Sequence, residues 1–403
     1  MFRKIRSVTT DSYNTVKNLN LNVKLYFGTT AIISLVQTPL FISMYFLVFA
    51  WGGDELDIGL IFGLASIVGV VGLIISGIAA DRWRRDVFIW LGGLIYISSM
   101  IYLIFASRIA DLYVVQIGAS IAGSFFMPAG AAMVADSTSK GTRTKIYTLM
   151  AIIQQVFMAI GGVAGYFIYK NLGDTFEPEV ILPVVKICIA VIILASLLVF
   201  FINDKRLLHS TLKDDVVSIE EKKRNELIIQ NLRNCKTFKQ KIAFYRTPLL
   251  IVAADFIIAF GAGISIPFLP SFFDQGYSKT MSELTLIFSL APLLTAVFSA
   301  VALRLGKKIG RVKAIFWIEL IAVILLLCFS FVPPLAIALG IFILRQAMMN
   351  AGWPLINAIV MDLLPSNQRA TFSAIDSLAF TAFNSLSQPI GGVIMTKNTF
   401  HFR

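Results

Sequence analysis

The sequence is short of the side chains on which most enzymes and metal sites depend. Its 403 residues contain two histidines and three cysteines, and neither type shows the paired spacing of a metal site. There is no serine nucleophile elbow and no glycine-rich loop with the lysine that binds ATP phosphates. These absences argue against an enzyme, the main alternative class, and against an ATP-driven pump. We expect no metal and no cofactor.

Charge is also scarce. Charged residues make up 14% of the chain and hydrophobic residues 57%, against about a quarter and about half in soluble domains. The apolar residues form runs of about 20 or more, each long enough to cross about 30 Å of hydrocarbon. We therefore expect an all-α integral membrane protein with eleven spans. The predicted spans are 25–51, 58–80, 87–107, 110–135, 146–170, 180–203, 248–273, 282–304, 312–333, 335–361 and 370–396.

The basic residues lie in short loops, which explains the formal net charge of +12 without nucleic acid. Clusters at 3–6, 82–85, 140–145 and 307–313 occupy the N-terminus and alternate loops, whereas 54–57 and 174–179 are acidic. Cytoplasmic loops carry the excess of Lys and Arg and meet anionic lipid. We therefore expect a multi-pass protein of the cell membrane, with a cytoplasmic N-terminus and the lipid bilayer as its surroundings.

The two halves of the chain repeat at a constant interval of 226 residues. At this interval residues 57–65 align with 283–291, and the same offset superposes three charged pairs. These are Arg85 on Arg311, Asp136 on Asp362, and Arg143 on Arg369. A parallel repeat of this kind places the substrate site near the membrane midplane, between the halves. We expect an N-terminal bundle over 1–203 and a C-terminal bundle over 248–403.

The polar segment 204–247 joins the two bundles. Charge runs alternate there with apolar residues such as Ile219, Leu227 and Leu232. We predict a cytoplasmic linker with one amphipathic helix on the membrane surface. A solvated, disordered tether is the alternative. The second half contains five predicted spans, so a twelfth span would be absent, because the chain is either naturally short or truncated.

Three loop motifs carry a family resemblance. Residues 77–85, Gly-Ile-Ala-Ala-Asp-Arg-Trp-Arg-Arg, resemble the G-x-x-x-D-R-x-G-R-R loop of the major facilitator superfamily, with Arg84 in place of the second glycine. Residues 307–311 form a second copy that keeps Gly310 and lacks the acid, and Pro128–Asp136 with Arg143 resembles a further motif. The resemblance implies two pseudo-repeats of six helices and solute transport by alternating access. Residues 161–165 faintly resemble a motif of drug–proton antiporters.

The same resemblance implies a cytoplasmic gate. Asp81 would lie near the N-terminus of a helix in the other half, where a carboxylate is stabilised by the helix dipole, and an arginine of the loop would pair with Asp136. Under the alternative hypothesis these arginines have no gate role and face lipid headgroups at the cytoplasmic surface. The candidate gate residues are Gly77, Asp81, Arg82, Arg85, Asp136, Arg143, Gly310, Arg311, Asp362 and Arg369.

Ionisable residues within spans are costly and usually functional. In the resembled family the spans that hold Asp255 and Arg345 line the central cavity, which makes these two the first candidates for binding solute or a proton. Solute binding that breaks an Asp255–Arg345 pair would couple proton movement to transport; the alternative is a static ion pair. Asp376 and Glu319 lie nearer the cytoplasmic interface, where a structural role is favoured. The remaining solute or proton candidates are Gln37, Asn350, Trp353 and Asp376.

These observations favour a secondary transporter that acts as a monomer and exports amphipathic compounds in exchange for protons. Proton-coupled uptake of a polar or anionic metabolite, held by Arg345, is the competing hypothesis. A non-transporting receptor or a truncated relic is the alternative class.

Overall fold

The structure is a computed structural model and is built of helices. It describes residues 19–82, 85–136, 140–203, 226, 230, 238–329, 331, 334–352, 355–356, 359 and 366–397. No strand occurs among these residues. They divide into two compact units: unit 1 is 1–215 with 280–289, and unit 2 is 216–279 with 290–403.

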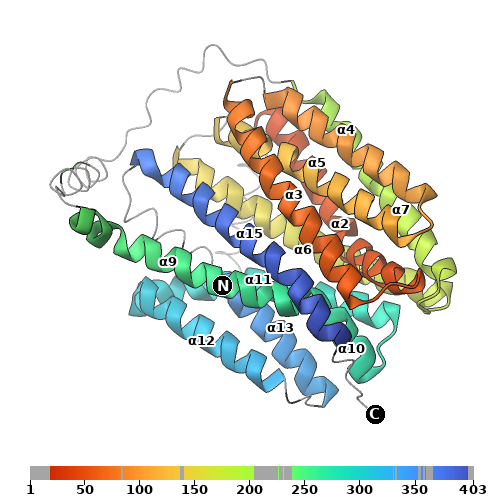
Figure 1. Cartoon of the computed structure of the whole chain (residues 1–403). Helices are drawn as coiled ribbons and strands as arrows, with labels where there is room; N and C mark the ends of the chain where they lie inside the picture. The colour runs from red at the N-terminus through yellow and green to blue at the C-terminus, as the bar shows by residue number, and fades with distance from the viewer. Residues whose placement is uncertain are drawn as a thin grey trace, which may run out of the picture. The chain divides into compact units, whose positions relative to one another are not determined.

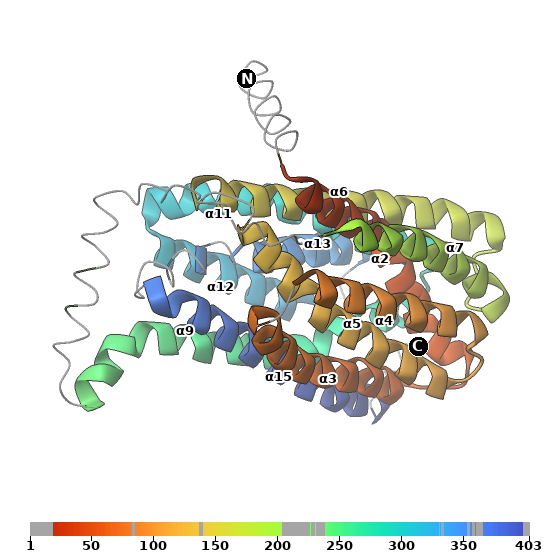
Figure 2. The same ribbon diagram turned by 90° about the horizontal axis from the view of Figure 1, so that it is seen from above.

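Unit 1 is a bundle of the first six long helices (Figures 1 and 2). In it α4 packs against α5 and α7, α5 also packs against α3, and α2 packs against α6 and α7. The helices are α2 (Leu21–Ala50), α3 (Glu55–Arg82), α4 (Arg85–Phe105), α5 (Ile109–Asp136), α6 (Lys140–Leu172) and α7 (Pro178–Leu197), followed by the 3₁₀ turn η1 (Leu198–Phe201).

One end of unit 1 is closed by a packed apolar cluster. Tyr26, Phe88 and Ile89 are buried there with residues of α5, α6 and η1. The phenol ring of Tyr26 lies so close to Gly130 that a Cβ on this glycine would be 2.0 Å from it, so only glycine fits. The Trp90 indole donates a hydrogen bond of 2.9 Å to the carbonyl of Ile202, which fixes α4 to the residue that follows η1.

The first residues of α11 belong to unit 1 and are held by an acidic cap. Asp174 follows α6 and accepts hydrogen bonds of 2.7 Å from both the backbone N–H and the hydroxyl of Ser282. The first N–H groups of a helix have no partner within it, so the carboxylate satisfies one of them and also interacts favourably with the helix dipole. Asp174 has φ = 55°, in the left-handed region that Asp tolerates better than most residues.

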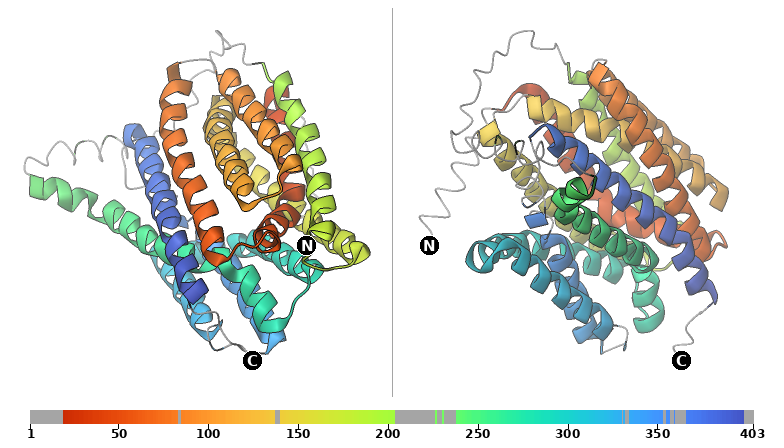
Figure 3. Two further views of the ribbon diagram at one scale, coloured as in Figure 1. Left: turned by 45° about the vertical axis from the view of Figure 1, so that its right-hand side comes forward. Right: turned by 60° about the vertical axis from the view of Figure 1, so that its left-hand side comes forward.

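Unit 2 contains the remaining helices. Figure 3 shows α9 and α15 side by side, and α12 packs against α13. The elements are α9 (Phe238–Ser265), the 3₁₀ turn η2 (Ile266–Phe268), α10 (Leu269–Tyr277), α11 (Met281–Ile309), α12 (Arg311–Phe329), α13 (Leu335–Ala351) and α15 (Ser366–Lys397). The α-helix is interrupted at Pro267, because proline lacks the N–H that would continue it.

The helices repeat as the sequence does. Four helices of the second half, α11, α12, α13 and α15, begin 226 residues after α3, α4, α5 and α6. The caps repeat too, since the N–H of Asp54 bonds to Asp57 and the N–H of Thr280 bonds to Glu283 at the same interval. Of the charged pairs that revealed the repeat, Arg85 and Arg311 therefore mark equivalent helix starts.

The multi-pass prediction is confirmed, with differences in detail. In the described part of the chain, nine helices are long and apolar enough to span a membrane. Within the predicted span 335–361, α13 ends at Ala351, and the described residues Leu355, Ile356 and Ile359 are helical again. The predicted boundary at residue 248 falls within α9, which begins ten residues earlier at Phe238. The predicted amphipathic helix of the linker lies outside the described residues.

Candidate functional site

Two buried carboxyl groups meet inside unit 2. Asp255 on α9 and Asp376 on α15 are each about 5% exposed. Their side chains lie close enough to interact with each other, and among the described residues one oxygen of each, Oδ2 of Asp255 and Oδ1 of Asp376, has no hydrogen-bond partner. Two ionised carboxylates both accept and neither donates. Like charges at a buried site disfavour ionisation of both acids, so the pair favours a state that holds a proton.

Close packing of α9 and α15 brings the two acids together. A Cβ on Gly263 would lie 2.0 Å from the Ser387 hydroxyl and 2.3 Å from the backbone oxygen of Asn384. Asn384 also donates a hydrogen bond of 3.1 Å to the carbonyl of Ala259. Glycine thus lets the backbones approach, and an amide joins them, as is typical of helix contacts in membranes.

A cavity of about 80 Å³ opens beside Asp255. Its polar lining comes from three helices: Asp255 of α9, Glu319 of α12, and Arg345, Gln346 and Asn350 of α13. Glu319 is close enough to Asp255 to interact with it electrostatically. The cavity therefore exposes two carboxyl groups, one guanidinium and two amides to whatever enters it. These groups suit a proton, water or a small polar ligand.

Arg345 is buried but is not neutralised by the acids. Its Nη1 donates a hydrogen bond of 2.9 Å to the Gln346 side chain, and among the described residues its Nε has no hydrogen-bond partner. Within the same residues no ion pair joins Arg345 to Asp255, and that acid interacts with Asp376 instead. The two residues expected to pair thus line one cavity without bonding. A buried guanidinium with an unused donor is costly, so it favours an anionic or polar ligand.

The other predicted solute residues are partly described. Gln37 lies in the middle of α2 and is exposed to a cavity of unit 1. Asn350 donates to the backbone carbonyl of Gln346, four residues before it. Trp353 lies outside the described residues. In the described part of the chain, no three acidic, His or Cys side chains come together as metal ligands.

Two of the predicted gate residues begin helices. Arg85 begins α4 and Arg311 begins α12. Between α11 and α12, Gly310 has φ = +93°, a conformation that favours glycine. Asp362 lies outside the described residues. For six further gate residues the structure describes the helix but not the surroundings of the residue: Gly77, Asp81, Arg82, Asp136, Arg143 and Arg369. The gate therefore stays a prediction.

Two amides of the site were not predicted from the sequence. Gln346 bonds to Arg345 and lines the cavity. Gln388 is buried on α15 and donates to the Asn384 side chain at 2.8 Å. The sequence contained one signal for both residues: each is a polar side chain within an apolar run and lies four residues from another amide. Such amides bond across or along helices in membranes.

Comparison with known proteins agrees with this architecture. A profile of the Major Facilitator Superfamily matches residues 26–396. No curated protein matches the chain by sequence. Among solved structures, a bacterial homologue of the human lysosomal transporter Spinster, inward-facing and unoccupied, is similar with a TM-score of 0.69 and 16% identity over 94% of this chain and 84% of that one.

Two further structures show the same fold. A D-xylose–proton symporter has a TM-score of 0.65 and 13% identity over 94% of this chain and 97% of its own. An inward-facing bacterial homologue of the iron transporter ferroportin has a TM-score of 0.66 and 11% identity over 92% and 91%. At these identities the likeness shows the fold alone, and the family follows from the profile. The chain belongs to the major facilitator superfamily, and it is accordingly a secondary transporter of small solutes that works by alternating access rather than an enzyme.

Proposed function

We propose that the chain exports amphipathic compounds in exchange for protons, and that the Asp255–Asp376 pair carries the proton. The observation that carries the proposal is that two carboxyl groups, both buried between α9 and α15, lie close enough to interact. Two negative charges in contact at a buried site disfavour each other, so the pair is stable there when it holds a proton. A proton can therefore change how these two helices interact.

Loss of that proton leaves two negative charges in contact. Glu319 adds a third acid nearby, and Arg345 lies on the same cavity without bonding to Asp255. In a medium of low dielectric constant such repulsion is strong. The deprotonated state therefore favours an arrangement in which water reaches the pair, whereas the protonated state favours the closed contact. A difference of this kind between two states is what coupling requires.

Transport in liposomes of purified protein tests the proposal. With an uncharged amphipathic dye, a pH gradient should drive dye accumulation and dye movement should carry protons in the opposite direction. A dye flux of the same size with and without a gradient, and without proton movement, would overturn the coupling.

Uptake of an anionic metabolite is the second candidate, because Arg345 is buried and its Nε has no hydrogen-bond partner among the residues that the structure describes. Under that hypothesis a carboxylate would bind the guanidinium, and Arg345→Ala would weaken its binding. Charge-assisted hydrogen bonds contribute about 1.5–3 kcal/mol, so the dissociation constant should rise by roughly tenfold or more. An unchanged constant for every anion tested would remove this candidate.

We also propose that the protein acts as a monomer in the cell membrane with its N-terminus in the cytoplasm. The alternation of basic and acidic loops supports this orientation. Single cysteines placed at Lys140 and Lys307 should react with an impermeant reagent from the same side. Reaction from opposite sides would disprove the topology.

A further inference from the structure

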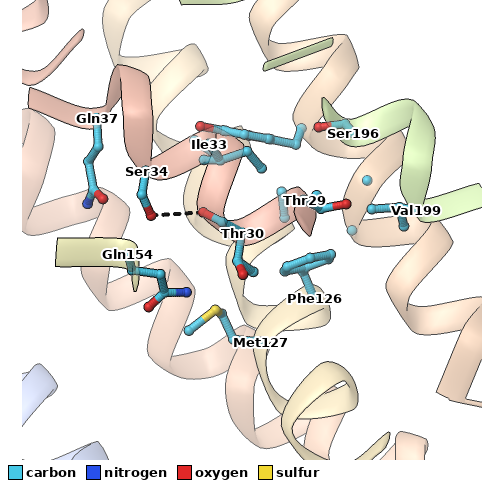
Figure 4. Close-up of a pocket in the computed structure, with 16 residues that line it drawn as sticks. Thr29, Thr30, Ile33, Ser34, Gln37, Phe126, Met127, Gln154, Ser196 and Val199 are labelled. Carbon is cyan, nitrogen blue, oxygen red and sulfur yellow. Dashed lines mark hydrogen bonds between the residues drawn. The ribbon is translucent and has the colours of Figure 1, made fainter. Parts of the chain in front are cut away.

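Unit 1 contains a cavity that the proton site does not involve. Its volume is about 480 Å³, and it reaches between α2, α4, α5 and α7, with Gln154 of α6 at its edge. Figure 4 shows Ser34, Gln37 and Gln154 at one side of it and Thr29, Ser196 and Val199 at the other. A second cavity of about 290 Å³ shares Ile33, Gln37, Tyr96 and Ala119 with the first. Both sizes are within or close to the range of small-molecule sites.

The polar groups of the first cavity are hydroxyl groups, including those of Tyr96 and Ser196, and side-chain amides. The hydroxyl groups of Thr29, Thr30 and Ser34 donate to the backbone carbonyls of Ala195, Phe27 and Thr30, so they offer only acceptor oxygens to the cavity. The side-chain amides of Gln37 and Gln154 take part in none of the hydrogen bonds among the described residues. Each amide can both donate and accept. The cavity is therefore equipped for a ligand with its own donors and acceptors.

Charge is missing from the lining of both cavities. Among the described residues that line them, there is no Asp, Glu, Lys or Arg. A charged group taken out of water without a counter-charge loses its hydration and gains nothing in return. The second cavity is also mostly apolar, with side chains such as Phe41, Phe62 and Met100. These walls favour an uncharged molecule with a large apolar part.

The place of Gln37 supports the same conclusion. It lies in the middle of a 30-residue apolar helix and is exposed in the bundle. A primary amide at that depth is costly in hydrocarbon unless it lines a polar cavity. Gln37 lines both cavities, so it lies between the polar lining of the first and the apolar lining of the second. A ligand anchored at Gln37 can reach both.

We propose that these two cavities form a binding site for an uncharged amphiphile. Its hydrogen-bonding head contacts Gln37 and Gln154, and its apolar part lies against Phe41, Phe62 and Met100. The site deepens the proposed export function, because it names the class of solute and the residues that hold it. Binding can be measured without a proton gradient, so failure of the site and failure of proton coupling are distinguishable.

Gly123 offers a way to fill the cavity without disturbing the bundle. It lines the first cavity, and a Cβ placed on it would meet no atom within 4 Å. Gly28 on α2 also has nothing within 4 Å and does not line either cavity. Leucine is a good helix former at both positions. Gly123→Leu therefore blocks the site, and Gly28→Leu is the matched control.

Photolabelling of the full-length protein in phosphatidylcholine nanodiscs tests the inference. The probe is a monoacylglycerol with a diazirine in its chain, and the comparison probe is an alkyl sulfonate with the same chain, which stays ionised. We expect the monoacylglycerol to label peptides of α2, α4 and α5 saturably, and the sulfonate to label them at least about tenfold less. Equal labelling by both probes would overturn the choice of an uncharged ligand.

The variants locate the site. Gly123→Leu should lower labelling of these peptides by about tenfold, and Gly28→Leu should leave it unchanged. Gln37→Leu removes the head contact without changing the helix, so it should also weaken labelling even if Gly123→Leu does not fold. Melting temperatures identify any variant that is not folded. Unchanged labelling in both folded Gly123→Leu and Gln37→Leu would refute the site.

Discussion

Replacing Asp255 by Asn separates the structural role of the acid pair from its proton. The Asn amide has nearly the same shape as the carboxyl group, and its Nδ2 can donate to the Asp376 carboxylate without any bound proton. The contact between α9 and α15 therefore persists, and the variant should fold. What it loses is the site at which a proton binds and leaves during the cycle.

The expected magnitude follows from the number of protons exchanged. One pH unit is worth 1.36 kcal/mol per proton, and about 1.4 kcal/mol corresponds to a tenfold ratio. If the Asp255–Asp376 pair releases one proton for each solute, the wild type should accumulate solute about tenfold per pH unit of gradient. Asp255→Asn should accumulate none. Exchange of labelled for unlabelled solute, which needs no net proton movement, should continue in the variant.

Liposomes of purified protein with a set pH gradient measure both quantities. Asp274→Asn is the matched control, because Asp274 lies in the same unit on α10 and does not line the cavity that holds Asp255. The control should accumulate solute as the wild type does. If Asp255→Asn accumulated solute as strongly as the control, the pair would not be the proton carrier, and a static role in packing α9 against α15 would remain.

Three further predictions concern backbone positions and caps, and each is checked by the melting temperature in detergent. Gly263→Leu places atoms within 2.3 Å of the backbone of α15 and should destabilise the protein by about 1–3 kcal/mol, whereas Gly261→Leu, with nothing within 4 Å, should be tolerated. Asp174→Ala removes the cap of α11 and should cost about 1 kcal/mol, and Asp174→Asn, which keeps an acceptor and tolerates the left-handed conformation, should cost less. Gly310→Ala is strained at φ = +93° and should destabilise the protein. Gly340→Ala, at an exposed position of α13, should stabilise it by about 0.5–1 kcal/mol. Equal effects of the two substitutions in any of these three comparisons would contradict the prediction.

The fold could be predicted from the sequence because it depends on features that a linear pattern records. The length of an apolar run decides whether a helix can span the bilayer, and the interval of 226 residues between charged loops reappears in the helix starts. The break before α10 was not predicted, although its cause is local: Pro267 cannot continue a helix. α13 ends earlier than predicted, at Ala351, because hydropathy alone does not define where a helix stops.

The partner of Asp255 was not predicted, for a physical reason. Counting residues along a span gives the depth of a side chain but not the direction in which it points. That direction is set by helix packing, here by the approach of α9 to α15 at Gly263. Asp255 was expected to pair with Arg345, and the structure brings it against Asp376 instead. The cavity around Gln37 left only a weak signal, since most of its lining is ordinary for a membrane helix.

The two units share a helix pattern but differ in the chemistry of their cavities. The described lining of the two unit 1 cavities contains no charged residue, whereas the unit 2 cavity beside Asp255 also contains Glu319 and Arg345. A solute bound by Gln37 and a proton bound by Asp255 would therefore not compete for the same atoms. Coupling must then arise because each ligand favours a different state of the whole protein.

Solute binding in unit 1 and proton binding at Asp255 should therefore be linked, although the two ligands do not compete for one site. In an exchanger, release of the proton favours the state that binds solute, so solute affinity in the wild type should rise with pH, by at most about tenfold per unit for one proton. In Asp255→Asn the same affinity should be independent of pH, although Gln37 and its cavity are unchanged. Titration calorimetry at several pH values with an uncharged amphiphile measures this. A pH dependence that survived in Asp255→Asn would place the proton elsewhere, because linkage is reciprocal and a group that no longer titrates cannot alter solute binding.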